Sequence, residues 1–181
     1  MNIYGRLFLL LLAVAVGAKR IAAQKFPEHA EYAFVAGLLH DTGMIMLDPY
    51  ILERKETFDE IISEDSVSFL EAERALLGTD HCEMGAEVLR EWGIPETLLK
   101  SVARHHGPSF SSGPLVCIVH VADIMARKIG FGIRETDDVL YGVDSKALEA
   151  IGMQAEDLEN FETEIIKATE TVAMEVMQET E

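Results

Sequence analysis

An apolar helical segment that stops at two adjacent metal-ligand residues is the feature that most constrains this chain. The apolar or small residues 33–39 lead directly into His40 and Asp41, and Gly43 follows two residues later. An unpaired buried charge is costly, so an ionisable pair at the buried end of a helix needs a partner. A divalent metal ion is one such partner, and further candidate ligands follow downstream.

The downstream candidates fall at the ends or on the faces of predicted helices. His81 begins one helix, His105 and His106 end another, and Asp123 lies inside a third. Divalent metal sites take nitrogen and oxygen ligands from elements that pack together, and this ordered series has that composition. The carboxylate of Asp41 has two oxygens and could bridge two ions, which would activate a water for phosphoester hydrolysis.

Each candidate also has a purely structural interpretation. The histidine pair precedes Gly107 and Pro108, so it could cap a helix, where cationic histidine is favoured by the helix dipole. His81 follows Asp80 and could form a surface pair at a helix start. We expect His29 and His120 to be bystanders, although His120 shares a helix face with Asp123 and could hydrogen-bond near the site.

Helical periodicity and helix-stop signals predict an all-α protein. The sequence has no run of alternating apolar and polar residues, flanked by hairpin turn signals, that would indicate β-strands instead. Ser68 and Glu71, like Asp80 and Glu83, have capping-box spacing. A short apolar stretch at 44–47 is expected to close at Asp48 and Pro49. The predicted helices cover residues 4–24, 27–40, 49–54, 57–62, 68–77, 80–92, 96–106, 114–129, 145–152 and 155–177.

The length of 181 residues suits one compact domain, and the net charge of −17 is strongly acidic. Residues 135–181 carry 14 acidic residues against two lysines. Such a surface repels nucleic acid and anionic membranes, so binding to either is not expected. We predict a motif core at about 30–130 and an acidic helical part at about 135–181.

The apolar run 7–16 follows Arg6 and has two readings. It is short for a transmembrane span, which needs roughly 20 apolar residues. It could be a core helix that continues to residue 23, or a signal peptide. Cys82 and Cys117 lie in unrelated contexts and read as reduced, buried thiols of a cytosolic protein.

Taken together, these motifs resemble one branch of the HD superfamily of metal-dependent phosphohydrolases, the HDOD domain (HD-related output domain). The similarity covers roughly residues 12–172 and implies an all-α, multi-helix HD-type fold. It supports the core-helix reading of 7–16, because the family has a helix there. The matching segments are residues 33–43, Glu73 to Ala86, Trp92 to Glu96, His105 to Pro108 and Val119 to Asp123.

Several departures from the family pattern bear on catalysis. HD hydrolases usually have a histidine one helix before the His-Asp pair, and this chain has none before His29. Met44 stands where a lysine is common, and Ser109 follows Gly107 and Pro108 where the cyclic-di-GMP phosphodiesterases have a glycine-tyrosine-proline motif. The family also usually has a helical segment before the present start, so we expect either a truncated domain or a short relative whose exposed first helix needs a partner.

The resemblance implies a bacterial signal-transduction output module that is non-catalytic and acts through signalling proteins or by self-association. In this reading a partial site of His40, Asp41, His81, His105, His106 and Asp123 holds one or two ions of Fe, Mn, Zn or Mg, or is empty. The alternative is a phosphohydrolase acting on a nucleotide or cyclic dinucleotide, with Arg104 and Arg127 as the nearest phosphate-binding candidates. A purely structural helical domain is the third possibility.

Overall fold

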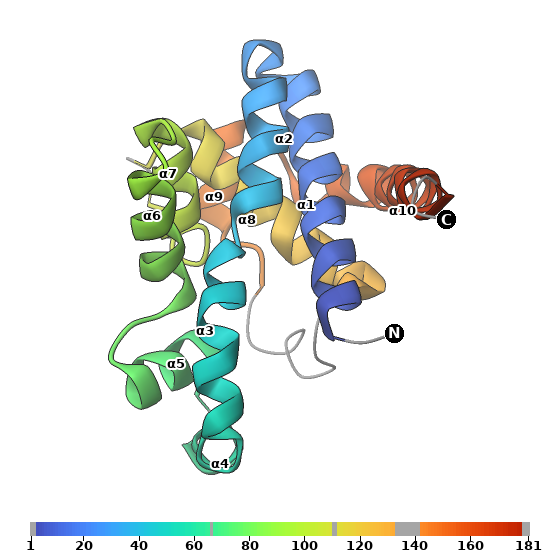
Figure 1. Cartoon of the computed structure of the whole chain (residues 1–181). Coiled ribbons are helices and arrows are strands. Elements are labelled where there is room, and N and C mark those ends of the chain that lie inside the picture. The colour runs from blue at the N-terminus through green and yellow to red at the C-terminus, as the bar shows by residue number, and fades with distance from the viewer. Residues whose placement is uncertain (1–2, 66, 110–111, 133–141, 179–181) are drawn as a thin grey trace. The chain divides into compact units, whose positions relative to one another are not determined.

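The computed structural model consists of helices, and the part of the chain that it describes contains no strand (Figure 1). It describes residues 3–65, 67–109, 112–132 and 142–178. The prediction of an all-α fold is therefore confirmed. The first residues of the predicted acidic part, up to residue 141, lie outside the described residues. Contacts divide the chain into two compact units, residues 40–103 and the remainder.

The unit formed by residues 1–39 and 104–181, here unit 1, is built around its first helix. This helix, α1 (Ile3–Lys25), packs against α2 (Ala30–Leu39), α8 (Pro114–Ala126) and α10 (Ala155–Gln178), while α9 (Ser145–Ile151) packs on α8. Figure 1 shows α1 and α2 side by side. Gly37 makes this pairing close, because a Cβ there would lie 2.7 Å from the Cα of Ala15.

Helix α1 is long and apolar enough to cross a membrane by length and composition alone. However, 61% of its most apolar window is buried inside the structure, with Leu10, Val14 and Ala18 fully covered. A helix that buries most of its apolar surface against other helices packs as a core helix does. The core-helix prediction for residues 7–16 agrees with this packing.

Residues 40–103, here unit 2, contain α3 (Thr42–Glu53), α4 (Lys55–Asp65), α5 (Phe69–Leu77), α6 (His81–Glu91) and all but the last residue of α7 (Glu96–Arg104). Leu47 and Ile51 of α3 form a core with Phe58 of α4 and Ala72 of α5. Phe58 and Phe69 pack edge to face at 5.1 Å between ring centroids. This small core holds α3 to α5 together, and α6 packs on α3.

Helices α3 and α6 approach each other unusually closely at Gly43 and Gly85. A Cβ at residue 43 would overlap the carbonyl oxygen of His81 and lie 2.8 Å from the Gly85 nitrogen. Only glycine fits such a backbone approach. The glycine two residues after Asp41 therefore brings the start of α3 against the start of α6.

Among the predicted boundaries that differ from the structure, those at Pro49 and at the histidine pair bear on the site. The stretch at 44–47 does not close at Asp48 and Pro49, because α3 runs through Pro49 to Glu53. Buried Leu47 and Ile51 anchor the helix on both sides of the proline, so packing offsets the missing backbone hydrogen bond. The helix predicted over 96–106 ends at Arg104, which leaves His105 and His106 in the following turn.

Candidate metal centre

His40 and Asp41 occupy the turn between α2 and α3, rather than the end of α2 as predicted. Both side chains have no exposed surface. Asp41 stands at the N-cap position of α3, yet its carboxylate accepts no capping hydrogen bond from the helix. Its oxygens lie beside histidine side chains instead.

The two oxygens of Asp41 face two different histidines. Oδ2 lies 3.2 Å from Nε2 of His40, and Oδ1 lies 3.5 Å from Nε2 of His81. His81 is also buried, and the close approach of Gly43 to the His81 backbone explains how residues 40 places apart meet. Unit 2 thus brings together three of the predicted ligands.

Glu73 holds the other side of the His81 ring. Its Oε2 accepts a hydrogen bond from Nδ1 of His81 at 2.6 Å and another from the His81 backbone nitrogen at 3.0 Å. Glu73 has no exposed surface. Sequence reasoning placed Glu73 in a family motif but gave it no role, because eight residues and a helix break separate it from His81.

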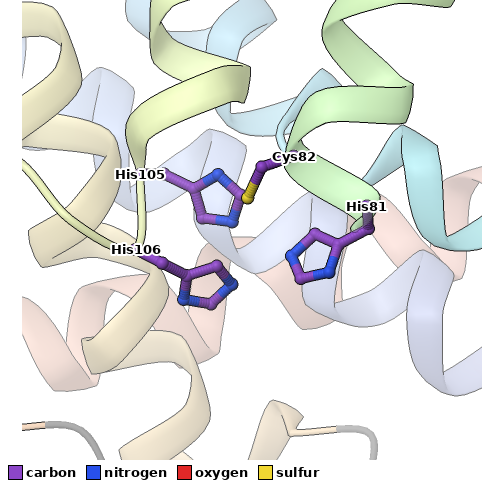
Figure 2. A group of neighbouring side chains, drawn as sticks. All are labelled: His81, Cys82, His105 and His106. Carbon is purple, nitrogen blue, oxygen red and sulfur yellow. The ribbon is translucent and has the colours of Figure 1, made fainter. Parts of the chain in front are cut away.

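The first turn of α6 is fixed by its cap. Asp80 accepts a hydrogen bond from the Glu83 backbone nitrogen at 2.9 Å and pairs with Arg74 of α5. Figure 2 shows His81 and Cys82 projecting from this turn. Cys82 is a buried thiol, and its sulfur and a ring nitrogen of His81 lie within 4.8 Å of each other. Sequence reasoning did not include Cys82 as a candidate ligand.

His105 and His106 follow α7 directly, in unit 1. Their rings lie 4.2 Å apart between centroids and are tilted by 43° (Figure 2). His105 has no exposed surface, whereas His106 is half-buried. The two histidines therefore differ in environment, as expected for adjacent residues that point in different directions.

His120, which we expected to be a bystander, is bonded through both ring nitrogens. Nδ1 donates to the carbonyl oxygen of His105 at 2.7 Å, and Nε2 accepts from the backbone nitrogen of Asp144 at 3.2 Å. These bonds require the neutral ring protonated at Nδ1. Burial lowers the pKa of His120, in keeping with that form. His120 thus fastens the turn that carries His105.

Asp123 forms a buried ion pair with Arg127. Nε of Arg127 lies 2.7 Å from Oδ1 of Asp123, one helical turn away, and both side chains are nearly covered. One carboxylate oxygen of Asp123 and one ring nitrogen of His105 also lie within 4.8 Å of each other. Arg104, the second phosphate-binding candidate, is exposed.

Around Asp41, unit 2 offers imidazole nitrogen and carboxylate oxygen, which are donor types that bind divalent ions. Imidazole and carboxylate together suit Zn, Fe or Mn. The prediction that His105, His106 and Asp123 belong to the same ligand set rests on the sequence pattern.

Comparison with known families identifies the chain. The sequence model of the HDOD domain matches residues 6–108, which is more than half of the chain. The chain belongs to the HDOD domain family. The match includes His40, Asp41, Glu73, His81 and the histidine pair, and it ends before Asp123.

Solved structures share this fold. The HDOD chain is similar to an HDOD domain protein of unknown function from Geobacter sulfurreducens, with 25% identity and a TM-score of 0.59 over 89% of this chain and 61% of that one. A protein from Marinobacter aquaeolei VT8 named as a candidate signal transduction protein has 14% identity and a TM-score of 0.74, covering 96% of this chain and 39% of that one. A candidate phosphohydrolase from Shewanella amazonensis SB2B has 19% identity and a TM-score of 0.68, covering 92% and 60%.

The similar proteins are longer than this HDOD chain. A curated relative, an uncharacterized protein from Treponema pallidum (strain Nichols), is 24% identical over 123 residues. The match covers 66% of this chain and 22% of that protein. The chain thus spans about a fifth of the curated relative that it matches.

Proposed function

We propose that this HDOD domain is a regulatory output module of bacterial signal transduction that works in the cytoplasm through protein partners. It holds a divalent ion at His40, Asp41 and His81 and does not hydrolyse phosphoesters. Membership of the HDOD family supports the regulatory role. The bound ion would supply a buried positive charge between the Asp41 carboxylate and the two imidazoles.

The ion pair between Asp123 and Arg127 carries the non-catalytic part of this proposal. In a two-metal hydrolase, each ligand carboxylate must coordinate a metal ion. Here the guanidinium of Arg127 already neutralises Asp123 at 2.7 Å in a buried position. The same contact occupies Arg127, which sequence analysis considered for phosphate binding.

Two sequence features agree with this proposal. The chain has no histidine before His29, so the usual first ligand of HD hydrolases has no counterpart in it. The net charge of −17 opposes the approach of an anionic phosphoester and of nucleic acid. We therefore expect the partners to be signalling proteins or a second copy of this chain.

A metal-dependent phosphohydrolase acting on a nucleotide or cyclic dinucleotide is the second candidate function. It is favoured by the arrangement in which the two oxygens of Asp41 face two different histidines, since a bridging carboxylate in a two-metal site has this geometry. If this candidate is right, Arg127 must leave Asp123 when metal binds.

Metal analysis combined with a hydrolysis assay separates the two candidates. The protein is purified without added metal, and its iron, manganese and zinc contents are measured for wild type and Asp41→Ala. Asp59→Ala is the matched control, because Asp59 pairs with Lys55 on the surface of the same unit. Each sample is also assayed with bis-p-nitrophenyl phosphate.

We expect one ion or less per chain in wild type and the control, loss of that ion in Asp41→Ala, and no hydrolysis by any sample. Hydrolysis by wild type that disappears in Asp41→Ala would overturn the regulatory proposal in favour of the enzyme. Metal content that is the same in wild type and Asp41→Ala would overturn the proposed ion site.

A further inference from the structure

Helix α3 carries apolar side chains on two opposite sides. Successive helical residues turn by about 100°, so Leu47 and Ile51, which belong to the core of unit 2, lie on one side. Ile45, Pro49 and Leu52, spaced four and three residues apart, lie together on the other side. We call these three residues the α3 stripe. An apolar side of a helix is normally covered by another element.

The α3 stripe is exposed along its length. Ile45 is 43% exposed and Leu52 is 55% exposed, and Pro49 between them is exposed as well. Single exposed apolar residues are normal on a protein surface. Three on one side of one helix are neighbours and form a patch, which is a feature of binding surfaces.

Acidic residues border the α3 stripe on both edges. By the same helical geometry, Asp48 lies beside Leu52 on one edge and Glu53 lies beside Pro49 on the other. The helix contains no lysine or arginine. Residues 40–103 as a whole carry 15 acidic residues against 5 basic ones. The surroundings of the stripe therefore favour a cationic partner.

The charge around the α3 stripe argues against two other occupants. In a symmetric dimer built on this patch, the stripe would face the same patch of a second copy, and the acidic edges would oppose each other. An anionic membrane would be repelled in the same way. A helix that has an apolar stripe with lysine or arginine beside it meets neither repulsion. Recognition of an amphipathic helix through apolar residues at this spacing is a recurring mode of binding.

We propose that the α3 stripe is the docking surface for a basic amphipathic helix of a partner protein. Apolar residues of that helix pack on the stripe, and its lysine or arginine residues face Asp48 and Glu53. This inference deepens the proposed function, because it names the chemistry of the partner, and it rests on the partner role assigned there. The stripe spans two helical turns, about 11 Å, so the contact is small and the binding is weak and transient.

The test measures the binding of a designed helical peptide to the full chain by fluorescence anisotropy. The peptide has about 18 residues, roughly 27 Å of helix, with leucines on one face and lysines and alanines elsewhere. A second peptide has glutamate in place of each lysine. We expect the lysine peptide to bind and the glutamate peptide not to bind. Binding should weaken as NaCl rises from about 10 mM to about 150 mM.

Substitutions at Leu52 separate docking on the stripe from general attraction by charge. Leu52→Asp adds a negative charge but removes an apolar anchor, so it should weaken binding of the lysine peptide by about 10-fold or more. Leu52→Ser removes the anchor without adding charge and should also weaken binding. Met174→Asp is the matched control, because Met174 is an apolar residue of α10 that is 61% exposed, and this variant should bind as well as wild type. Circular dichroism of each variant verifies the helical fold.

Several results would overturn the inference. Absence of binding to wild type would remove the docking surface, and binding to Leu52→Asp as tight as to wild type would mean that net charge alone attracts the peptide. Equal binding of the two peptides would contradict the role of the acidic edges. A wild-type dimer that Leu52→Asp dissociates in sedimentation velocity would assign the stripe to a second copy. Binding to phosphatidylserine vesicles that Leu52→Asp abolishes would assign it to a membrane.

These outcomes are distinguishable from failure of the proposed function. A lysine peptide that does not bind would overturn the docking surface, while the ion site and the expected lack of hydrolysis would stand. Hydrolysis that depends on Asp41 would overturn the regulatory proposal, whatever the peptide experiment shows about the α3 stripe.

Discussion

Gly43 is the residue on which the meeting of Asp41 and His81 depends. A side chain at this position would collide with the backbone of α6, which is less able to move than a flexible side chain. We expect Gly43→Ala to lower the free energy of unfolding by about 3 kcal/mol, the upper part of the range for overpacking. Urea denaturation followed by circular dichroism measures this change.

Gly107 provides the control for that substitution. A Cβ at residue 107 would meet nothing within 4 Å, so Gly107→Ala should leave the urea midpoint nearly unchanged. Equal effects of the two substitutions would show that the α3–α6 crossing tolerates a methyl group, which contradicts the close approach described here.

The buried pair of Arg127 and Asp123 gives a second prediction at this scale. Arg127→Met leaves the Asp123 carboxylate buried beside an apolar side chain, and removing one partner of such a pair costs about 3–5 kcal/mol. Adding Asp123→Asn to Arg127→Met should restore part of the lost stability, because it removes the uncompensated charge. The unfolding free energies of wild type, both single variants and the double variant form the cycle that measures this coupling.

Lys128 is the neighbouring control. Its pair with Glu162 is largely exposed, so Lys128→Met should cost no more than about 1 kcal/mol. A cost for Arg127→Met as small as that for Lys128→Met would mean that Asp123 finds another cation, as the hydrolase candidate requires.

At the level of single residues, part of the candidate site could be predicted from the sequence. His40, Asp41 and His81 are ligand types at predicted helix ends, and the structure brings them together in unit 2. Asp123 and Arg127 are four residues apart, a spacing at which opposite charges on a helix can pair. This ion pair could therefore have been predicted from the sequence, but it was not. The contact of Glu73 with His81 could not be predicted from the sequence, because it depends on the conformation of the turn between α5 and α6.

At the level of elements, the start of α5 depends on a capping box. The Ser68 hydroxyl accepts from the Glu71 backbone nitrogen at 3.1 Å, and the Glu71 carboxylate accepts from the Ser68 backbone nitrogen at 2.9 Å. Ser68→Ala should therefore destabilise the protein by about 1 kcal/mol, measured from the urea midpoint. Ser63→Ala is the control, since Ser63 is exposed and its hydroxyl donates to the Glu60 carbonyl within α4.

The same cap predicts a dependence on pH. The hydrogen bond from the Ser68 backbone lowers the pKa of Glu71 below its ordinary value of 4.5. Stability from a lowered carboxyl pKa is present above the unfolded value and is lost as the pH falls through the folded value. The stability difference between wild type and Glu71→Gln should shrink as the pH falls from about 7 to about 3. A difference that stays constant over this range would contradict the charged cap.

Helix boundaries show why prediction of elements was incomplete. The capping box at Ser68 is local, and sequence analysis located the start of α5 correctly. The predicted break at Asp48 and Pro49 is wrong. Contacts of Leu47 and Ile51 with other helices join the stretch 44–47 and the helix predicted from Pro49 into the single helix α3. The end of α7 also depends on a contact from another helix, because His120 of α8 donates a hydrogen bond to the carbonyl oxygen of His105 in the turn that follows α7.

At the level of the whole molecule, the family assignment explains the all-α fold. The net charge of −17 is a property of this particular sequence. The 32 acidic residues outnumber the 15 basic ones, so folding gathers negative charge into a smaller volume. Such self-repulsion destabilises the folded state and is weakened by salt. Buried pairs such as Asp123 and Arg127 are screened much less.

Added salt should therefore stabilise this protein. Raising NaCl from about 10 mM to about 150 mM shortens the screening length from roughly 30 Å to roughly 8 Å. We expect the thermal midpoint to rise by about 2–4 °C, which corresponds to about 1 kcal/mol for a chain of this size. A double variant, Glu149→Gln with Glu170→Gln, removes two exposed charges and should respond less to salt than wild type. A midpoint that falls with salt would show that attractive surface pairs outweigh the net repulsion, and that the acidic surface does not limit the stability of the fold.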